Sequence, residues 1–141
     1  QGKRSAQIAN YADAYGCLAV VLNAAVDPDT VRMVKENVDI PVIYTVIAKH
    51  QVIKEHIEAG VDILNISGGK ETPEITRLFR EKYPQIPIIA TGGRKDESIL
   101  ATIDAGANAI SYTPKTTQEV FQENMENYRE DLEIDFEEGL E

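Results

Sequence analysis

The stretch IPIIATGGRKDESILATIDAGANAISYTP, residues 86–114, holds one complete strand, helix, strand unit. Residues 86–91 are a run of aliphatic residues that ends at Gly92 and Gly93, and residues 108–113 form a second apolar strand pattern. The residues between them, 96–106, are typical of a short helix. Two strands joined by a helix of this length indicate a right-handed crossover within a parallel sheet.

The same alternation runs through the chain. We expect strands at residues 17–23, 40–47, 61–67, 86–91 and 108–113, and helices at residues 5–15, 28–38, 49–60, 72–83, 96–106 and 116–132. Asp27 and Pro28 suit the N-cap and first position of the second helix. The fold class is therefore α/β, five βα units with a parallel sheet, of (β/α)-barrel segment type. The alternative is a flavodoxin-like three-layer sandwich, which differs in strand order: 2-1-3-4-5 instead of 1-2-3-4-5.

Length and charge restrict the functions to consider. The 141 residues suit a single α/β domain, residues 1–133, followed by an acidic, disordered tail, residues 134–141. The net charge is −10, and residues 119–141 alone carry −9, so the body is nearly neutral. A body without a basic stripe argues against a nucleic-acid partner. The apolar runs fall far short of the roughly 20 residues of a membrane span, so we expect no membrane partner and a cytoplasmic protein.

Cysteine and histidine usage gives no sign of a metal. The single cysteine, Cys17, lies at the start of an apolar strand pattern, where a buried and inert thiol is expected. His50 and His56 lie six residues apart, which does not place them on one face of a helix. We therefore expect no metal site and no cofactor.

Small polar residues recur at the ends of the expected strands. Because the carboxyl ends of parallel strands meet at one edge, where ligands bind, these residues are candidates to line a pocket. They are Asn23, Thr45, Asn65, Ser67, Thr91, Ser111 and Thr113. Most follow an apolar residue two positions earlier (Val21, Ile63, Ile89 and Ala109), so we expect them to share a face with buried neighbours. The alternative is that each merely bonds to the backbone.

Two glycine pairs end neighbouring strands, and each precedes a basic residue. They are Gly68 and Gly69 before Lys70, and Gly92 and Gly93 before Arg94. Glycine lets successive amides point toward one anion, and a following helix N-terminus favours negative charge. A phosphate or carboxylate is the expected ligand. The alternative is that the glycines serve turn geometry alone.

Residues 86–111 resemble the segment from strand seven to strand eight of phosphate-binding (β/α)8 barrels. That group includes ribulose-phosphate-type epimerases, N-acylmannosamine-phosphate epimerase and the IMP dehydrogenase type. The resemblance implies that Gly92, Gly93 and Ser111 hold a phosphate. Arg94 stands where these barrels usually have an aliphatic residue, and residues 111–114 read Ser-Tyr-Thr-Pro where a Gly-Ser or Gly-Thr pair is usual. As a barrel segment the chain supplies five of eight units.

The chain also resembles a response-regulator receiver domain, with Thr91 and Lys115 near the Thr and Lys of that family. The phosphoacceptor Asp of receivers is replaced by the sequence Asn65, Ile66, Ser67. A receiver-like fold would therefore imply a regulatory or interaction module without phosphorylation chemistry.

The candidates for catalysis are Lys49, Lys70 and Lys115, with Asp27 and His50 in loops. Lys49 is preferred, because it follows an apolar strand where desolvation would lower its pKa. The alternative is a solvated lysine at a helix start. Taken together, the sequence predicts a protein that binds a phosphate-bearing small molecule at the carboxyl edge of the sheet, as part of an isomerase, epimerase or lyase of phosphorylated metabolites. The alternatives are the non-catalytic module, or a barrel fragment that covers its sheet edges by forming a homodimer.

Overall fold

The computed structural model describes residues 2–93 and 95–139, and its core is one parallel sheet. The strands are β1 (Val20–Leu22), β2 (Val42–Val46), β3 (Ile63–Ile66), β4 (Ile88–Thr91) and β5 (Ala109–Ser111). They pair in the order β1-β2-β3-β4-β5. This sequential order confirms the α/β fold of barrel-segment type. The flavodoxin-like alternative, and with it the receiver-like module, is wrong because it needs β1 between β2 and β3.

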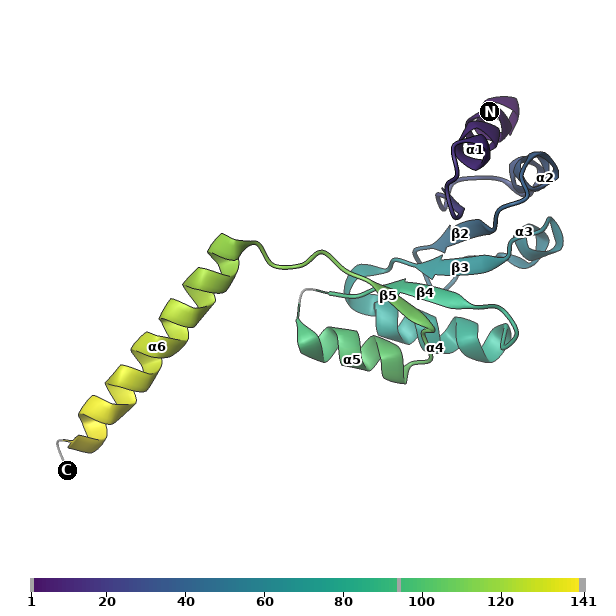
Figure 1. Ribbon diagram of the computed structural model, residues 1–141. Helices are drawn as coiled ribbons and strands as arrows, with labels where there is room; N and C mark the ends of the chain where they lie inside the picture. Colours follow the sequence, from purple (N-terminus) through teal and green to yellow (C-terminus); the bar gives the residue numbers. More distant parts are fainter. Residues whose placement is uncertain (1, 94, 140–141) are drawn as a thin grey trace.

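Helices connect the strands. They are α1 (Gly2–Ala14), α2 (Pro28–Asn37), α3 (Lys54–Glu58), the 3₁₀ turn η1 (Gly69–Glu71), α4 (Thr72–Lys82), α5 (Asp96–Asp104) and α6 (Thr117–Gly139). Figure 1 shows α4 and α5 on the same side of the sheet, with α1 beside α2. Asp27 caps α2 as expected, because its carboxylate accepts a hydrogen bond from the Thr30 amide at 2.7 Å. That bond lowers the pKa of Asp27.

The two faces of the sheet differ in burial. Leu64, Ile66 and Ile88 are fully buried against the helices, where Ile75 and Phe79 of α4 join the same core. Successive side chains of a strand point to opposite faces of the sheet, so helices that cover one face bury every second residue.

The opposite face, which would line the inside of a closed barrel, is open except at β2, where Ile43 is buried. Val21 is 60% exposed, Ala109 is exposed, and Ile63 and Ile89 are only partly buried. The expectation that the strand-end polar residues share a face with buried neighbours is therefore wrong.

Helix α3 is shorter than expected. Residues 49–53, which we expected to be helical, are not: residues 49–50 form a turn, residues 51–53 have no regular structure, and the Gln51 side chain bonds to the end of β2 and the loop after it. Its carbonyl oxygen accepts a hydrogen bond from the Ile47 amide at 3.0 Å, and its amide group donates to the Tyr44 hydroxyl at 3.1 Å. A side chain that occupies backbone groups in this way competes with helix formation.

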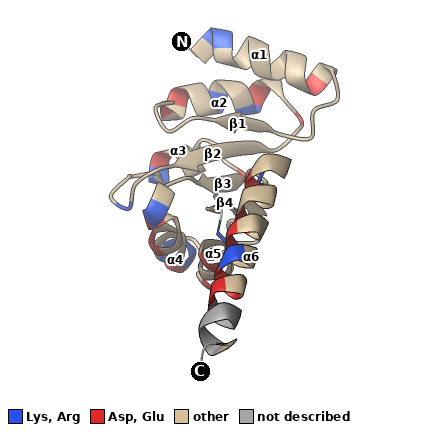
Figure 2. Ribbon diagram, turned by 90° about the vertical axis from the view of Figure 1, so that its left-hand side faces the viewer, with Lys and Arg blue, Asp and Glu red and all other residues tan. Residues whose placement is uncertain are grey.

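One further expectation fails near the start of the chain. Cys17 is exposed and lies before β1, so it is no buried thiol. At the other end, α6 runs to Gly139 and extends away from the sheet (Figure 1). The division into a domain of residues 1–133 and a disordered tail of residues 134–141 stays a prediction. Figure 2 shows acidic residues along α6. Among the described residues, no helix is long and apolar enough to cross a membrane.

Candidate functional site

A cavity of about 390 Å³ opens where β3 and β4 end. Four residues that the sequence singled out contribute to its wall: Gly69, Lys70, Thr91 and Gly93. The rest comes from Lys95, from the first turn of α4, and from Ser98 and Thr102 of α5. The sheet order places the two glycine turns side by side, because β3 and β4 are paired neighbours.

The turn after β3 uses its two glycines differently. The Gly68 amide donates a hydrogen bond to the Thr72 hydroxyl at 3.0 Å, and a Cβ at Gly68 would collide with Cδ1 of the buried Ile75. Gly69 has a φ of +61°, which other residues rarely adopt, and no atom lies within 4 Å of the place where its Cβ would be. Its amide bonds to no described residue. Gly68 is therefore a packing residue, and Gly69 faces the cavity.

The turn after β4 repeats this division in its amide hydrogen bonds but not in its packing, because a Cβ at Gly93 would collide with the Ser98 hydroxyl oxygen. The Gly92 amide donates to the Ser111 carbonyl at 2.8 Å, and a Cβ at Gly92 would lie 2.8 Å from Cγ2 of Ile110. Gly93 lines the cavity, and its amide makes no hydrogen bond within the described part of the chain. The Gly68 and Gly92 amides are therefore both bonded internally, and phosphate binding by these two residues stays a prediction without that support.

The positive groups at the cavity are Lys70 and Lys95, which form no ion pair with a described side chain. Sequence reasoning missed Lys95 and also Ser98, which lines the cavity and donates its hydroxyl hydrogen to the Lys95 carbonyl at 2.9 Å. The available signal was the position of Lys95 directly before α5. Two amides without a partner among the described residues, two ammonium groups and the N-terminus of α5 together suit an anion.

A second cavity, of about 640 Å³, lies at the ends of β1 and β2. The predicted residues Asn23 and Thr45 line it, together with His50 and Gln51. Its polar groups largely serve the fold: the Asn23 side-chain oxygen accepts a hydrogen bond from the Ala25 amide at 3.0 Å, and Gln51 is bonded as described above. This cavity therefore offers fewer unused polar groups to a ligand than the cavity at β3 and β4.

The remaining predicted residues are not gathered in these cavities. Asn65, Ser67, Ser111 and Thr113 line neither of them. Asn65 instead donates its side-chain amide to the Thr45 hydroxyl at 3.4 Å. Arg94 lies outside the described residues.

Lys49 does not have the environment that we expected. Its ammonium group lies 3.2 Å from Glu74 and 3.5 Å from Glu71, and the side chain is about half exposed. The hydrogen bond to Glu74, aided by the charges of both glutamates, raises the pKa of Lys49. The expected lowering by desolvation is therefore wrong, and Lys49 is protonated at neutral pH. A catalytic role for Lys49 stays a prediction without that support.

The described residues contain no group of three or more His, Cys, Asp or Glu side chains placed to hold a metal ion.

The sequence matches no known protein family. Among solved structures, the native structure of KDPGal superposes with a TM-score of 0.59 at 18% identity, over 83% of this chain and 53% of that chain. Mandelate oxidase with 3,3-difluoro-2-hydroxy-3-phenylpropionic acid gives a TM-score of 0.62 at 18% identity, over 81% of this chain and 46% of that one. A mandelate oxidase mutant with the monooxide FMN adduct gives 0.62 at 19% identity, over 81% and 45%.

These neighbours are TIM-barrel proteins, and the chain spans about half of their length. At such low identity the likeness shows the fold. The five βα units in sequential order account for it, because consecutive units of a TIM barrel are adjacent around the ring. The chain thus has the fold of part of a TIM barrel.

Proposed function

We propose that this chain binds a phosphate-bearing small molecule in the cavity at the carboxyl ends of β3 and β4. One observation carries the proposal: the second glycine of each turn, Gly69 and Gly93, lines the same cavity with an amide that bonds to no other described residue. The turns after β3 and β4 therefore each bring to the same cavity a backbone amide that has no partner among the described residues. An anion with several acceptor oxygens satisfies such an arrangement.

The surroundings fit the same ligand. Lys70 and Lys95 supply positive charge, and the N-terminus of α5 adds the favourable end of its dipole. A volume of about 390 Å³ lies within the range of roughly 300–1,000 Å³ that is usual for small-molecule sites. The position also agrees with the fold, since TIM-barrel enzymes bind their ligands at the carboxyl ends of the strands.

A reaction class is part of the same proposal. Within a complete barrel the site would hold the phosphate of a substrate whose other end reaches the open inner face, as part of an isomerase, epimerase or lyase of phosphorylated metabolites. The residues of this cavity bind and orient, because amides and ammonium groups neutralise an anion. The groups that move protons would then act at a distance from the phosphate, on the same face of the sheet.

Thermal unfolding in the presence of anions tests the binding. Inorganic phosphate and ribose 5-phosphate should raise the melting temperature, while ribose without a phosphate should not. At a ligand concentration about 100 times the Kd, the gain is about 2.7 kcal/mol, which corresponds to several degrees.

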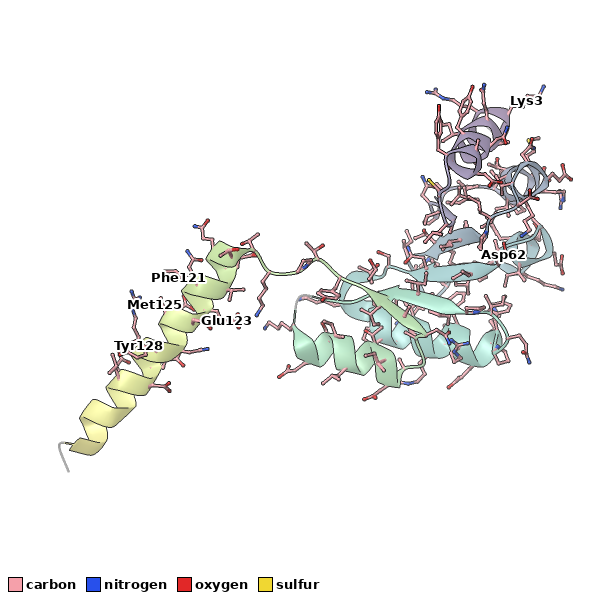
Figure 3. All side chains as sticks on the ribbon, in the orientation of Figure 1. Lys3, Asp62, Phe121, Glu123, Met125 and Tyr128 are labelled. Atoms are coloured by element: carbon pink, nitrogen blue, oxygen red, sulfur yellow. The ribbon has the colours of Figure 1, made fainter. Side chains whose placement is uncertain are left out.

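The variants Lys70→Gln and Lys95→Gln, combined, should abolish most of this gain. Lys3→Gln is the matched control, because Lys3 lies on α1, far from the cavity (Figure 3). No rise with either phosphate, or an equal rise in the double variant and the control, contradicts the proposal.

A further inference from the structure

Helix α6 carries a row of exposed apolar side chains. Phe121 is 63% exposed, Met125 37%, Tyr128 59% and Leu132 50%. Their spacings of four, three and four residues are those of a coiled-coil seam, in which apolar side chains recur every 3.5 residues on average. We call these four side chains the α6 seam. An exposed row of this length on a helix is a contact surface without its partner.

The α6 seam does not face the rest of the molecule. Glu123, on another side of the helix, forms an ion pair with Lys115 of the preceding linker at 2.6 Å. Figure 3 shows Phe121, Met125 and Tyr128 along one side of α6, and Glu123 on another. Because the ion pair fixes which side of α6 is turned toward the linker, the seam points away from the sheet. The described part of α6 makes no extensive contact with any other helix or strand.

The charges on α6 indicate which partner fits. Its acidic residues lie mainly on the far side from the seam, at positions where they would stay in water: Glu119, Glu123, Glu126, Glu130 and Glu133. The positions that flank the seam hold Gln122, Asn124, Arg129 and Asp131. These flanks carry one positive and one negative charge, so their sum is zero. A basic partner would require acidic flanks, whereas neutral flanks suit a surface with the same composition.

We propose that the α6 seam pairs with the α6 seam of a second copy of this chain. Each helix contributes one acidic and one basic flanking residue, so two seams meet without the repulsion that the acidic far sides would create. Phe121 and Tyr128 supply aromatic surface, and Met125 makes favourable contacts with aromatic rings. The seam runs about 16 Å along the helix axis, at 1.5 Å per residue. Four side chains per helix lie at the low end of what a specific interface buries, so the dimer is weak and depends on concentration.

Sedimentation equilibrium of the full chain over a range of concentrations tests this pairing. The unsubstituted chain should shift from monomer to dimer as the concentration rises. Phe121→Ser should weaken association by at least about tenfold, because burial of a phenylalanine accounts for that much affinity. Tyr128→Ser should act in the same direction.

Val120→Ser is the matched control. Val120 is also apolar and 43% exposed, but it lies about 100° around the helix from Phe121. It should leave association unchanged, and circular dichroism should show equal helix content in all variants. A chain that stays monomeric at every concentration overturns the proposal. So does association that Phe121→Ser and Val120→Ser weaken equally, or not at all, because the interface would then lie elsewhere, as at the open edges of the sheet.

Discussion

The turn after β3 and the turn after β4 each contain a pair of glycines. In both turns, the amide of the first glycine is hydrogen-bonded within the fold, and the amide of the second has no partner among the described residues. Gly68 and Gly92 are enclosed by side chains, and their amides are bonded to Thr72 and to Ser111. Gly69 and Gly93 face one cavity, and their amides bond to no other described residue. Gly93 also serves close packing, because a Cβ there would collide with the Ser98 hydroxyl oxygen. The two explanations that the sequence left open, turn geometry and anion binding, therefore apply to different residues in the turn after β3, and both apply to Gly93 in the turn after β4.

The largest effect is expected at the first glycines. Gly68→Ala should destabilise the protein by about 1–3 kcal/mol, because the new Cβ meets Ile75 in a core that cannot easily relax. Gly92→Ala should act similarly against Ile110 and Ile99. Urea unfolding measures both changes. A loss of stability within experimental error at both positions would show that the first glycines are dispensable for packing.

The second-largest effect on the free energy of unfolding is expected at Thr72, whose hydroxyl accepts the hydrogen bond of the Gly68 amide. Thr72→Val keeps the shape of the side chain but removes the acceptor at 3.0 Å, which leaves a partly buried amide unbonded. The expected cost is about 1–2 kcal/mol in the free energy of unfolding.

Thr76→Val is the control for this change, because the Thr76 hydroxyl only adds a bond to the Thr72 carbonyl within the same helix. It should cost clearly less than Thr72→Val. If the two substitutions lower the free energy of unfolding equally, the hydrogen bond between Thr72 and the Gly68 amide does not stabilise the protein more than the bond within the helix does.

A smaller effect is expected at Gly69. Gly69→Ala places a Cβ on a backbone with a φ of +61°, which costs about 1 kcal/mol, although the space around it is open. Gly69→Asn should cost less than Gly69→Ala, because asparagine tolerates this conformation better. The comparison uses thermal or urea unfolding, and a larger loss for Asn than for Ala would point to a steric cause instead.

The smallest effect on stability is expected at the lysines. Lys70→Gln and Lys95→Gln should each change the free energy of unfolding by less than about 0.5 kcal/mol without ligand, because both are surface residues. Each should weaken phosphate binding, as measured by calorimetry. If either lysine variant loses stability but keeps its affinity for phosphate, that lysine stabilises the fold and does not bind the ligand, which contradicts its assigned role.

The sheet could be predicted from the sequence because its strands are local patterns. Residues 40–47 and 86–91 are aliphatic runs bounded by turn residues, and each became a strand. The extent of α3 could not be predicted in this way, since it depends on hydrogen bonds of Gln51 to residues of β2 and the loop after it. The open face could not be predicted either, because alternation along a strand does not tell what covers it.

Half of the candidate site was visible in the sequence. Gly69, Lys70, Thr91 and Gly93 share a cavity because β3 and β4 are neighbours, which the alternation of strands and helices implies. The pKa of Lys49 was misjudged because Glu71 and Glu74 lie on η1 and α4, more than twenty residues away along the chain. A pKa shift caused by charges that are distant in the sequence and close in the fold cannot be predicted from neighbouring residues.

The central claim is that the second glycine of each turn presents its amide to an oxyanion. A titration of the ¹⁵N-labelled chain with inorganic phosphate, followed by amide chemical shifts, tests it directly. The amide signals of Gly69 and Gly93 should move together with one binding constant, while those of Gly68 and Gly92 stay nearly in place. Signals of Gly69 and Gly93 that remain still at saturating phosphate, or that move no more than those of Gly68 and Gly92, would contradict the account.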